Sequence, residues 1–174
     1  MQKIFKIFSC SFLVFMSPFI GHAWTEGELR EQIEARIKDR HPHPDSEFWL
    51  SVGKSGSKVL RELYSQTNST YEKIRILESL VWFRESENTR FLKSVTNDEK
   101  TSILKSRALR SVALSEGLNE ENYLVQMSHH SDPLVQKEAL HLLDETRQQR
   151  KITQEAKKQK VVQPGRVMRI QRYN

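Results

Sequence analysis

Three stretches of this chain decide its fold: residues 69–81 (STYEKIRILESLV), 101–113 (TSILKSRALRSVA) and 132–144 (DPLVQKEALHLLD). They begin 32 and then 31 residues apart, and each starts with a residue type that caps helices by accepting a hydrogen bond from a free backbone N–H. Apolar residues then recur at helical spacings of three and four, and they align in three columns: Ile76, Ala108 and Ala139; Leu77, Leu109 and Leu140; Leu80, Val112 and Leu143. The pattern predicts three amphipathic helices with equivalent buried faces.

A second set of helices with the same period precedes these three. Its columns, each spaced by 32, are Val59, Phe91 and Tyr123; Leu60, Leu92 and Leu124; Leu63, Val95 and Met127. Because a single two-helix hairpin cannot bury two apolar faces by itself, such hairpins stack on one another. The fold class expected is therefore all-α: a short α-solenoid of about three two-helix repeats over residues 57–146.

The last repeat carries a family resemblance. Its residues Asp132-Pro133-Leu134-Val135, followed by Ala139-Leu140 and Leu143, resemble the second helix of the HEAT-repeat family, particularly the short bacterial HEAT-like form. At the position where that family usually has Arg, this chain has Gln136, and the equivalents are Lys105 and Lys73. The resemblance implies a protein-interaction scaffold and no particular activity, because a fold alone does not decide function.

The N-terminus predicts export. Residues 1–23 combine a basic start (Lys3, Lys6), an apolar run and the small residues Gly21 and Ala23, which is the form of a secretory signal peptide cleaved after Ala23. An uncleaved anchor is the alternative. The one cysteine, Cys10, lies inside this segment, so a cleaved chain has no thiol for disulfides or catalysis. The predicted location is periplasmic or secreted.

The mature chain is predicted to begin with a helical cap over residues 24–56. Leu29, Ile33 and Ile37 are spaced by four, and Thr25 with Glu28 has the pattern of a capping box. The segment Gly53 to Gly56 (GKSG) lacks the spacing of a nucleophile elbow and that of a phosphate loop. It is interpreted as a turn that enters a helix.

Charge is unevenly distributed along the chain. Residues 24–146 hold 17 basic and 21 acidic residues, whereas residues 147–174 hold nine basic residues and one acidic residue, Glu155. This basic tail, partly helical or disordered, is a candidate for binding anionic lipid or an envelope polymer. A solvated tail that only aids solubility is the alternative, and export argues against nucleic acid. The candidate residues are Arg147, Arg150, Lys151, Lys157, Lys158, Lys160, Arg166, Arg169 and Arg172.

No pattern in the chain indicates catalysis, a cofactor or a metal. The histidines His41, His43, His129 and His130 lie near carboxylates, but they fall in breaks between helices and are better explained as polar turns. Trp82 is expected to pack in the core, with an exposed docking patch as the alternative.

The second helix of each repeat offers the best candidate binding surface, because solenoids commonly bind partners along the face formed by those helices. The candidate partner-binding residues are Lys73, Arg75, Lys105, Arg107, Arg110 and His141. The function predicted is that of a non-catalytic scaffold or escort for an unidentified protein in the bacterial envelope. The alternative is an attachment protein that acts through its basic tail, and the oligomeric state is left open.

Overall fold

A computed structural model describes residues 24–40 and 46–161 of the chain, and within these ranges the regular structure is entirely helical, as predicted. The predicted signal peptide lies outside the described residues. Within them, no helix has the length and apolar character needed to cross a lipid bilayer. The helices are α1 (Glu26–Lys38), α2 (Ser46–Gln66), α3 (Thr70–Ser79), η1 (Leu80–Trp82), α4 (Ser86–Asp98), α5 (Ser102–Glu116), η2 (Gly117–Glu120), α6 (Glu121–Met127) and α7 (Pro133–Val161).

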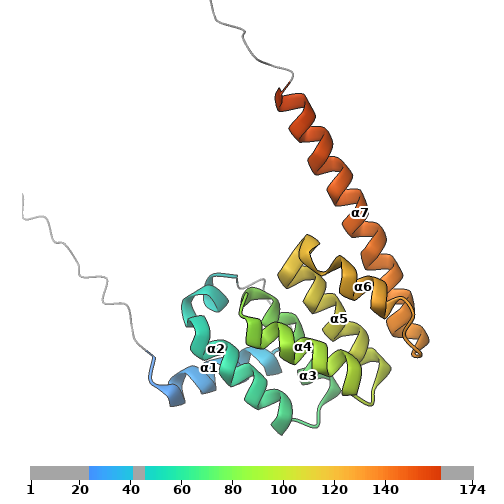
Figure 1. The fold of residues 1–174 in the computed structure, drawn as a ribbon. Helices are drawn as coiled ribbons and strands as arrows, with labels where there is room; N and C mark the ends of the chain where they lie inside the picture. Colours follow the sequence, from blue (N-terminus) through green and yellow to red (C-terminus); the bar gives the residue numbers. More distant parts are fainter. Residues whose placement is uncertain (1–23, 41–45, 162–174) are drawn as a thin grey trace, which may run out of the picture.

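Helix α1 lies against α2 and α3 (Figure 1). Its start is fixed by the predicted capping box: the Thr25 side chain accepts from the Glu28 amide at 3.3 Å, and the Thr25 amide donates to the Glu28 carboxylate at 3.0 Å. The apolar stripe of Leu29, Ile33 and Ile37 is buried. The amphipathic pattern of this segment therefore places α1 over the first helices of the body.

Helix α2 consists of two arms joined at Gly53. This glycine has φ 54° and ψ −152°, a backbone conformation that side-chain-bearing residues rarely adopt. The first arm buries Trp49, whose ring packs edge-on against Phe48 at 5.0 Å and Phe83 at 6.2 Å. The second arm approaches the first closely: a Cβ on Gly56 would lie 2.4 Å from a methyl carbon of Val52. The glycines predicted to form a turn thus form a kink inside one helix.

The rest of the body consists of helix pairs. The second arm of α2 packs on α3, α4 packs on α5, and α6 packs on α7. The second members of the pairs also contact one another in order, α3 with α5 and α5 with α7 (Figure 1). Buried side chains of α1 to α5 form one apolar cluster, and a second cluster joins Leu109 of α5 to α6 and α7. Helix α5 therefore connects the two clusters.

Most positions of the predicted core columns are buried, Phe91 and Tyr123 are half-buried, and Leu140 is exposed. Leu60, Leu92 and Leu124 are completely buried, and so are Ala108 and Ala139. These columns agree with the prediction. Leu140 is different: 51% of its surface is exposed, whereas its equivalents Leu77 and Leu109 are fully buried. The expectation that Leu140 is a core residue is wrong. Helix α5 packs on α3, and α7 packs on α5, but no further described helix packs on α7, so Leu140 stays exposed.

Polar contacts between successive helix pairs repeat with the period of the sequence. In one kind, a hydroxyl on the first helix of a pair donates to a carboxylate at the end of the second helix or in the segment after it. In the other kind, a basic side chain on the first helix forms an ion pair with a carboxylate near the start of the next first helix. The hydroxyl contacts are Ser57 to Glu85 (2.9 Å) and Thr89 to Glu116; the ion pairs are Arg61–Glu87 (2.9 Å) and Lys93–Glu120 (2.8 Å). Each residue of the second set of contacts lies 31 to 33 positions after the equivalent residue of the first set.

Candidate functional site: the outward face of α3, α5 and α7

The second helices share a face that points away from the core. At 100° per residue, the positions i, i+4, i+7 and i+11 of a helix fall within about 60° of one another. In each second helix these positions lie opposite the buried columns. They are Tyr71, Arg75, Glu78 and Trp82 in α3 and η1; Ile103, Arg107, Arg110 and Leu114 in α5; Leu134, Glu138, His141 and Glu145 in α7. We call this surface the second-helix face.

Ion pairs between neighbouring helices occupy the centre of the second-helix face. Glu78 of α3 lies 3.7 Å from Arg75 on its own helix and 3.7 Å from Arg107 on α5. Arg110 of α5 donates to the Glu138 carboxylate of α7 at 2.6 Å. This hydrogen bond raises the pKa of Arg110 above its usual value. Of the arginines predicted to bind a partner, Arg107 and Arg110 therefore pair with carboxylates of adjacent helices, and Arg75 pairs with a carboxylate of its own helix.

The other predicted partner-binding residues lie beside this centre. Lys73 faces the turn of the next helix pair, 3.7 Å from Glu99 and 4.9 Å above the Tyr64 ring. Lys105, its equivalent in α5, is half-buried near Asp132. His141 is exposed and lies 3.3 Å from Glu145. Only His141 of these three belongs to the second-helix face.

A hydrogen bond from the Ser102 hydroxyl lowers the pKa of Asp132, and the charge of Lys105 acts in the same direction. The contact therefore keeps the carboxylate ionised at the start of α7.

Apolar side chains line both edges of the second-helix face. The N-terminal edge consists of Tyr71, Ile103 and Leu134, and the C-terminal edge consists of Trp82 and Leu114. All five are between 36% and 60% exposed. Their spacings of 32 and 31 place them in equivalent positions of neighbouring helices. Solvent-exposed apolar residues at equivalent positions of neighbouring helices are typical of a contact surface.

The sequence prediction missed these edges, although the signal was present. The period that aligns the core columns aligns Tyr71, Ile103 and Leu134 as well, and Trp82 with Leu114. Trp82 was expected to be packed in the core, and that expectation is wrong: its neighbour Phe83 is buried and Trp82 is not. The helical backbone ends at Trp82, the last residue of the 3₁₀ turn η1, and Phe83 has extended backbone angles (φ −113°, ψ 101°).

The candidate tail residues fall into three groups. Arg147 and Arg150 both pair with Glu121 of α6, with Arg147 at 3.8 Å. Lys151 and Lys157 are exposed on the part of α7 that projects beyond the body (Figure 1). Lys158 and Lys160 belong to α7, although their side chains are not described, and Arg166, Arg169 and Arg172 lie outside the described residues.

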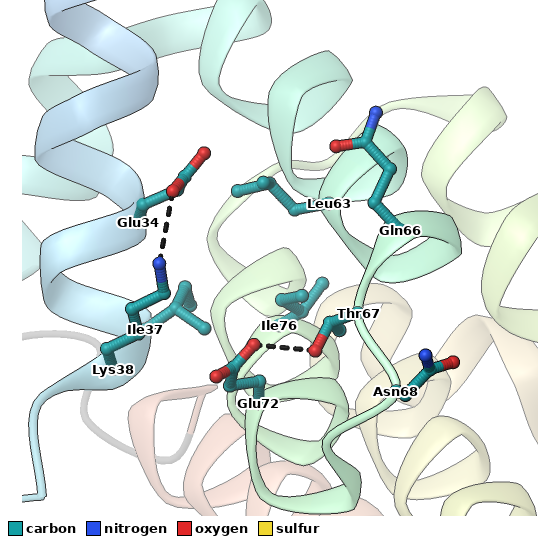
Figure 2. A pocket seen from close by; sticks show the side chains of 9 residues that line it. All are labelled: Glu34, Ile37, Lys38, Leu63, Gln66, Thr67, Asn68, Glu72 and Ile76. Carbon is teal, nitrogen blue, oxygen red and sulfur yellow. Dashed lines mark hydrogen bonds and ion pairs between the residues drawn. The ribbon is translucent and has the colours of Figure 1, made fainter.

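A cavity of about 350 Å³ opens between α1, α2 and α3 (Figure 2). Ile37, Leu63 and Ile76 form its apolar wall. The two carboxylates on its rim already have partners: Glu34 pairs with Lys38 at 3.2 Å, and Glu72 accepts from the Thr67 hydroxyl at 2.6 Å (Figure 2). Both acids are thus engaged in contacts within the protein.

Candidate metal ligands do not converge in the described part of the chain, where no three His, Asp or Glu side chains are placed to share an ion. The ring nitrogen Nδ1 of His130 accepts a hydrogen bond from the Asp132 amide at 2.9 Å, which accounts for this histidine as part of a turn. His41 and His43 lie outside the described residues.

Comparison with known proteins adds no relative: no protein-family model, no curated protein and no solved structure matches this chain. The resemblance to HEAT repeats stays a prediction made from residues 132–143.

Proposed function

We propose that residues 57–146 form a short HEAT-like α-solenoid that binds a partner protein through the second-helix face, as a non-catalytic scaffold or escort in the bacterial envelope. The observation that supports this most directly is the N-terminal edge of that face. Tyr71, Ile103 and Leu134 occupy equivalent positions in three adjacent helices, and all are exposed. Scattered surface apolar residues need no explanation, but an aligned set marks an interaction surface.

The repeating junctions support the solenoid part of the proposal. Arg61–Glu87 joins the first pair to the second, and Lys93–Glu120 joins the second to the turn before the third. The hydroxyl contacts Ser57–Glu85 and Thr89–Glu116 recur beside these ion pairs. A solenoid is built by repeating one interface between neighbours. Contacts that recur at the sequence period are what such an interface requires.

The chemistry of the face favours a protein as the partner. Apolar edges supply the area whose removal from water drives association, and charged groups between them supply orientation. Because Glu78 and Glu138 pair with the central arginines, the face carries little uncompensated charge. A strongly charged polymer would therefore gain little from it, whereas a protein segment with apolar side chains would.

A site-specific crosslinking experiment tests the proposal. A photoreactive amino acid is placed at Ile103 on the face and, as the control, at Val125 of α6, which is similarly exposed but lies on a first helix. We expect the probe at Ile103 to capture one protein from a bacterial envelope extract, and Ile103→Ser with Leu134→Ser to abolish copurification of that protein. Equal capture at both positions would contradict the proposal.

A second candidate function rests on the projection of α7. The helix continues to Val161 beyond its pairing with Glu121, and Lys151 and Lys157 are exposed on it (Figure 1). We infer that this arm could attach the protein to anionic lipid or envelope polymer. Replacing Lys151, Lys157, Lys158 and Lys160 with Gln would then abolish sedimentation with anionic vesicles while leaving capture at Ile103 unchanged. Sedimentation that persists in this variant, with capture at Ile103 unchanged, would contradict the second function and leave the first.

A further inference from the structure

A second cavity, of about 590 Å³, opens between the second arm of α2 and the start of α4. Four of its lining residues are cationic: Lys54, Lys58, Arg61 and Arg84. We propose that this cavity binds a phosphate group, carried either by a lipid headgroup or by a soluble phosphate compound. The cavity contains no residue of the second-helix face, so the inference goes beyond the proposed partner binding.

The charges of the cavity are not balanced by its own carboxylates. Two acids line it against the four cations: Glu87 pairs with Arg61 at 2.9 Å, and Glu85 accepts from the neutral Ser57 hydroxyl at 2.9 Å and keeps its negative charge. Lys54 and Arg84 are exposed and form no ion pair with the described part of the chain. An anion between them would meet two positive charges without displacing an existing contact.

Lys58 can join these two cations. Its ammonium group is 3.9 Å from Glu62, at the outer limit of an ion pair, and its side chain is largely exposed. Exposed pairs of this kind contribute little to stability, so Lys58 can turn toward an anion at small cost. Three basic side chains from α2 and from the segment before α4 thus surround one volume. Such convergence suits a phosphate, whose oxygens each accept hydrogen bonds from charged donors.

Neutral donors complete the cavity. The hydroxyls of Ser55 and Ser86 line it, and Ser86 is the first residue of α4. The residue before it, Glu85, makes no side-chain capping bond to α4, whereas Ser69 caps α3. The Glu85 carboxylate is held by Ser57 and does not cap α4, and the Asn88 N–H donates to the Glu85 carbonyl at 3.0 Å. The N–H groups of Ser86 and Glu87 therefore receive no capping bond from the Glu85 side chain. These groups favour an anion that the cationic side chains attract.

The kink at Gly53 explains how the sequence builds this site. Its positive φ ends the first arm of α2 and begins a new one at Lys54, and the first two residues of that arm line the cavity. The segment 53–56 lacks the spacing of a phosphate loop, yet in the fold Lys54 and Ser55 line the same cavity as Arg84, which lies in the segment before α4. The site therefore depends on two segments about 30 residues apart, which no local motif reveals.

The test uses the full mature chain and a readout local to the cavity. Backbone amide NMR shifts of Ser55 and Ser86 are followed during titration with inorganic phosphate, and then with vesicles of phosphatidic acid in phosphatidylcholine and of phosphatidylcholine alone. We expect phosphate to shift both amides, and Lys54→Gln with Arg84→Gln to weaken binding about tenfold or more. The matched control, Lys100→Gln with Lys137→Gln, removes the same charge from exposed positions elsewhere and should change binding less than about twofold.

The vesicle arms identify the source of the phosphate. Shifts of Ser55 and Ser86 with phosphatidic acid vesicles and not with phosphatidylcholine support a lipid headgroup, and shifts with inorganic phosphate alone support a soluble compound. Because Lys54 and Arg84 have no ion-pair partner in the described structure, the double variant should melt like the wild type. Absence of local shifts with either probe, or an equal loss of binding in the control variant, would overturn the proposal.

Discussion

Arg110 of α5 and Glu138 of α7 lie 2.6 Å apart, at the same place where Glu78 of α3 and Arg107 of α5 meet one junction earlier. Residue 110 is the equivalent of 78, and residue 138 is the equivalent of 107. The two ion pairs thus form between equivalent helix positions, but the acidic and the basic residue have exchanged places. Because α5 has an arginine at both positions, it fits an acidic neighbour on either side.

Reversing one charge of this pair should destabilise the protein, and reversing both should restore it. Arg110→Glu would place two carboxylates together and lower the free energy of unfolding by about 1 kcal/mol, since the 37% exposure of the Arg110 side chain lets solvent screen the pair. Adding Glu138→Arg recreates the ion pair in the opposite sense. Thermal melts of the two variants check this. A double variant that stays as unstable as Arg110→Glu would contradict the contact.

Substitutions of Leu109 and Leu140 compare a leucine that is covered by a neighbouring helix with an equivalent leucine that is not. They are equivalent residues, but Leu109 is fully buried and Leu140 is half exposed. Leu109→Ala should lower the free energy of unfolding by about 2–5 kcal/mol, as expected for a buried leucine that leaves a cavity. Leu140→Ala should lower it by less than about 1 kcal/mol. Urea titrations measure both, and similar losses in the two variants would show that α7 is covered at Leu140.

The stability of the protein should fall in acid partly through Glu99. Partial burial works against ionisation of this carboxyl, but hydrogen bonds from the Tyr64 hydroxyl and the Lys100 amide, together with the Lys73 charge, bring the pKa of Glu99 below its usual 4.5. A carboxyl with a lowered pKa stabilises the folded state above that usual value, and this contribution disappears as the pH falls through the folded-state pKa.

Glu99→Gln should therefore melt at a lower temperature than the wild type at pH 7, with a difference that shrinks from pH 5 to pH 3. Melting curves across this range provide the measurement. A difference that stays constant with pH would mean that the ionised carboxylate of Glu99 makes no contribution.

Two glycines should respond in opposite ways to alanine. Gly53 has a positive φ, so Gly53→Ala should cost about 1–3 kcal/mol of strain even though no atom lies within 4 Å of the new Cβ. Gly27 is in α1, where nothing obstructs a Cβ and helical φ is normal. Gly27→Ala should stabilise the protein by about 0.5 kcal/mol through helix propensity. Thermal melts of both variants distinguish strain from a simple effect of glycine removal.

Periodicity could predict the helices and most of the core, because burial at Leu60, Leu92 and Leu124 repeats for the same reason in each pair. Periodicity could not predict that Leu140 is exposed. Whether the last member of a column is covered depends on what packs beyond it, and the residue itself carries no sign of that. The same holds for Trp82, whose orientation follows from the short turn that ends its helix.

The candidate sites were harder to predict for a related reason. On its own helix Arg110 looks like a solvated residue, and its partner Glu138 lies 28 residues away, so the pair appears only once the register of α5 and α7 is known. The exposed column of Tyr71, Ile103 and Leu134 was visible as a period, but an apolar residue is assigned to the core by default. The phosphate cavity requires Lys54 and Arg84 to be close in space, and nothing local links them.

The projecting part of α7 fixes the distance between the body and the end of this helix. Beyond Arg150, which pairs with the body at Glu121, the helix continues to Val161, a distance of about 16 Å at 1.5 Å per residue. A helix of this kind transmits length and direction, because each residue is tied to the next turn by backbone hydrogen bonds. Whatever is attached at its far end is therefore held at a set distance beyond the end of the second-helix face, along the axis of α7. Inserting or removing one turn would change that distance by about 5.4 Å while rotating the attachment only slightly.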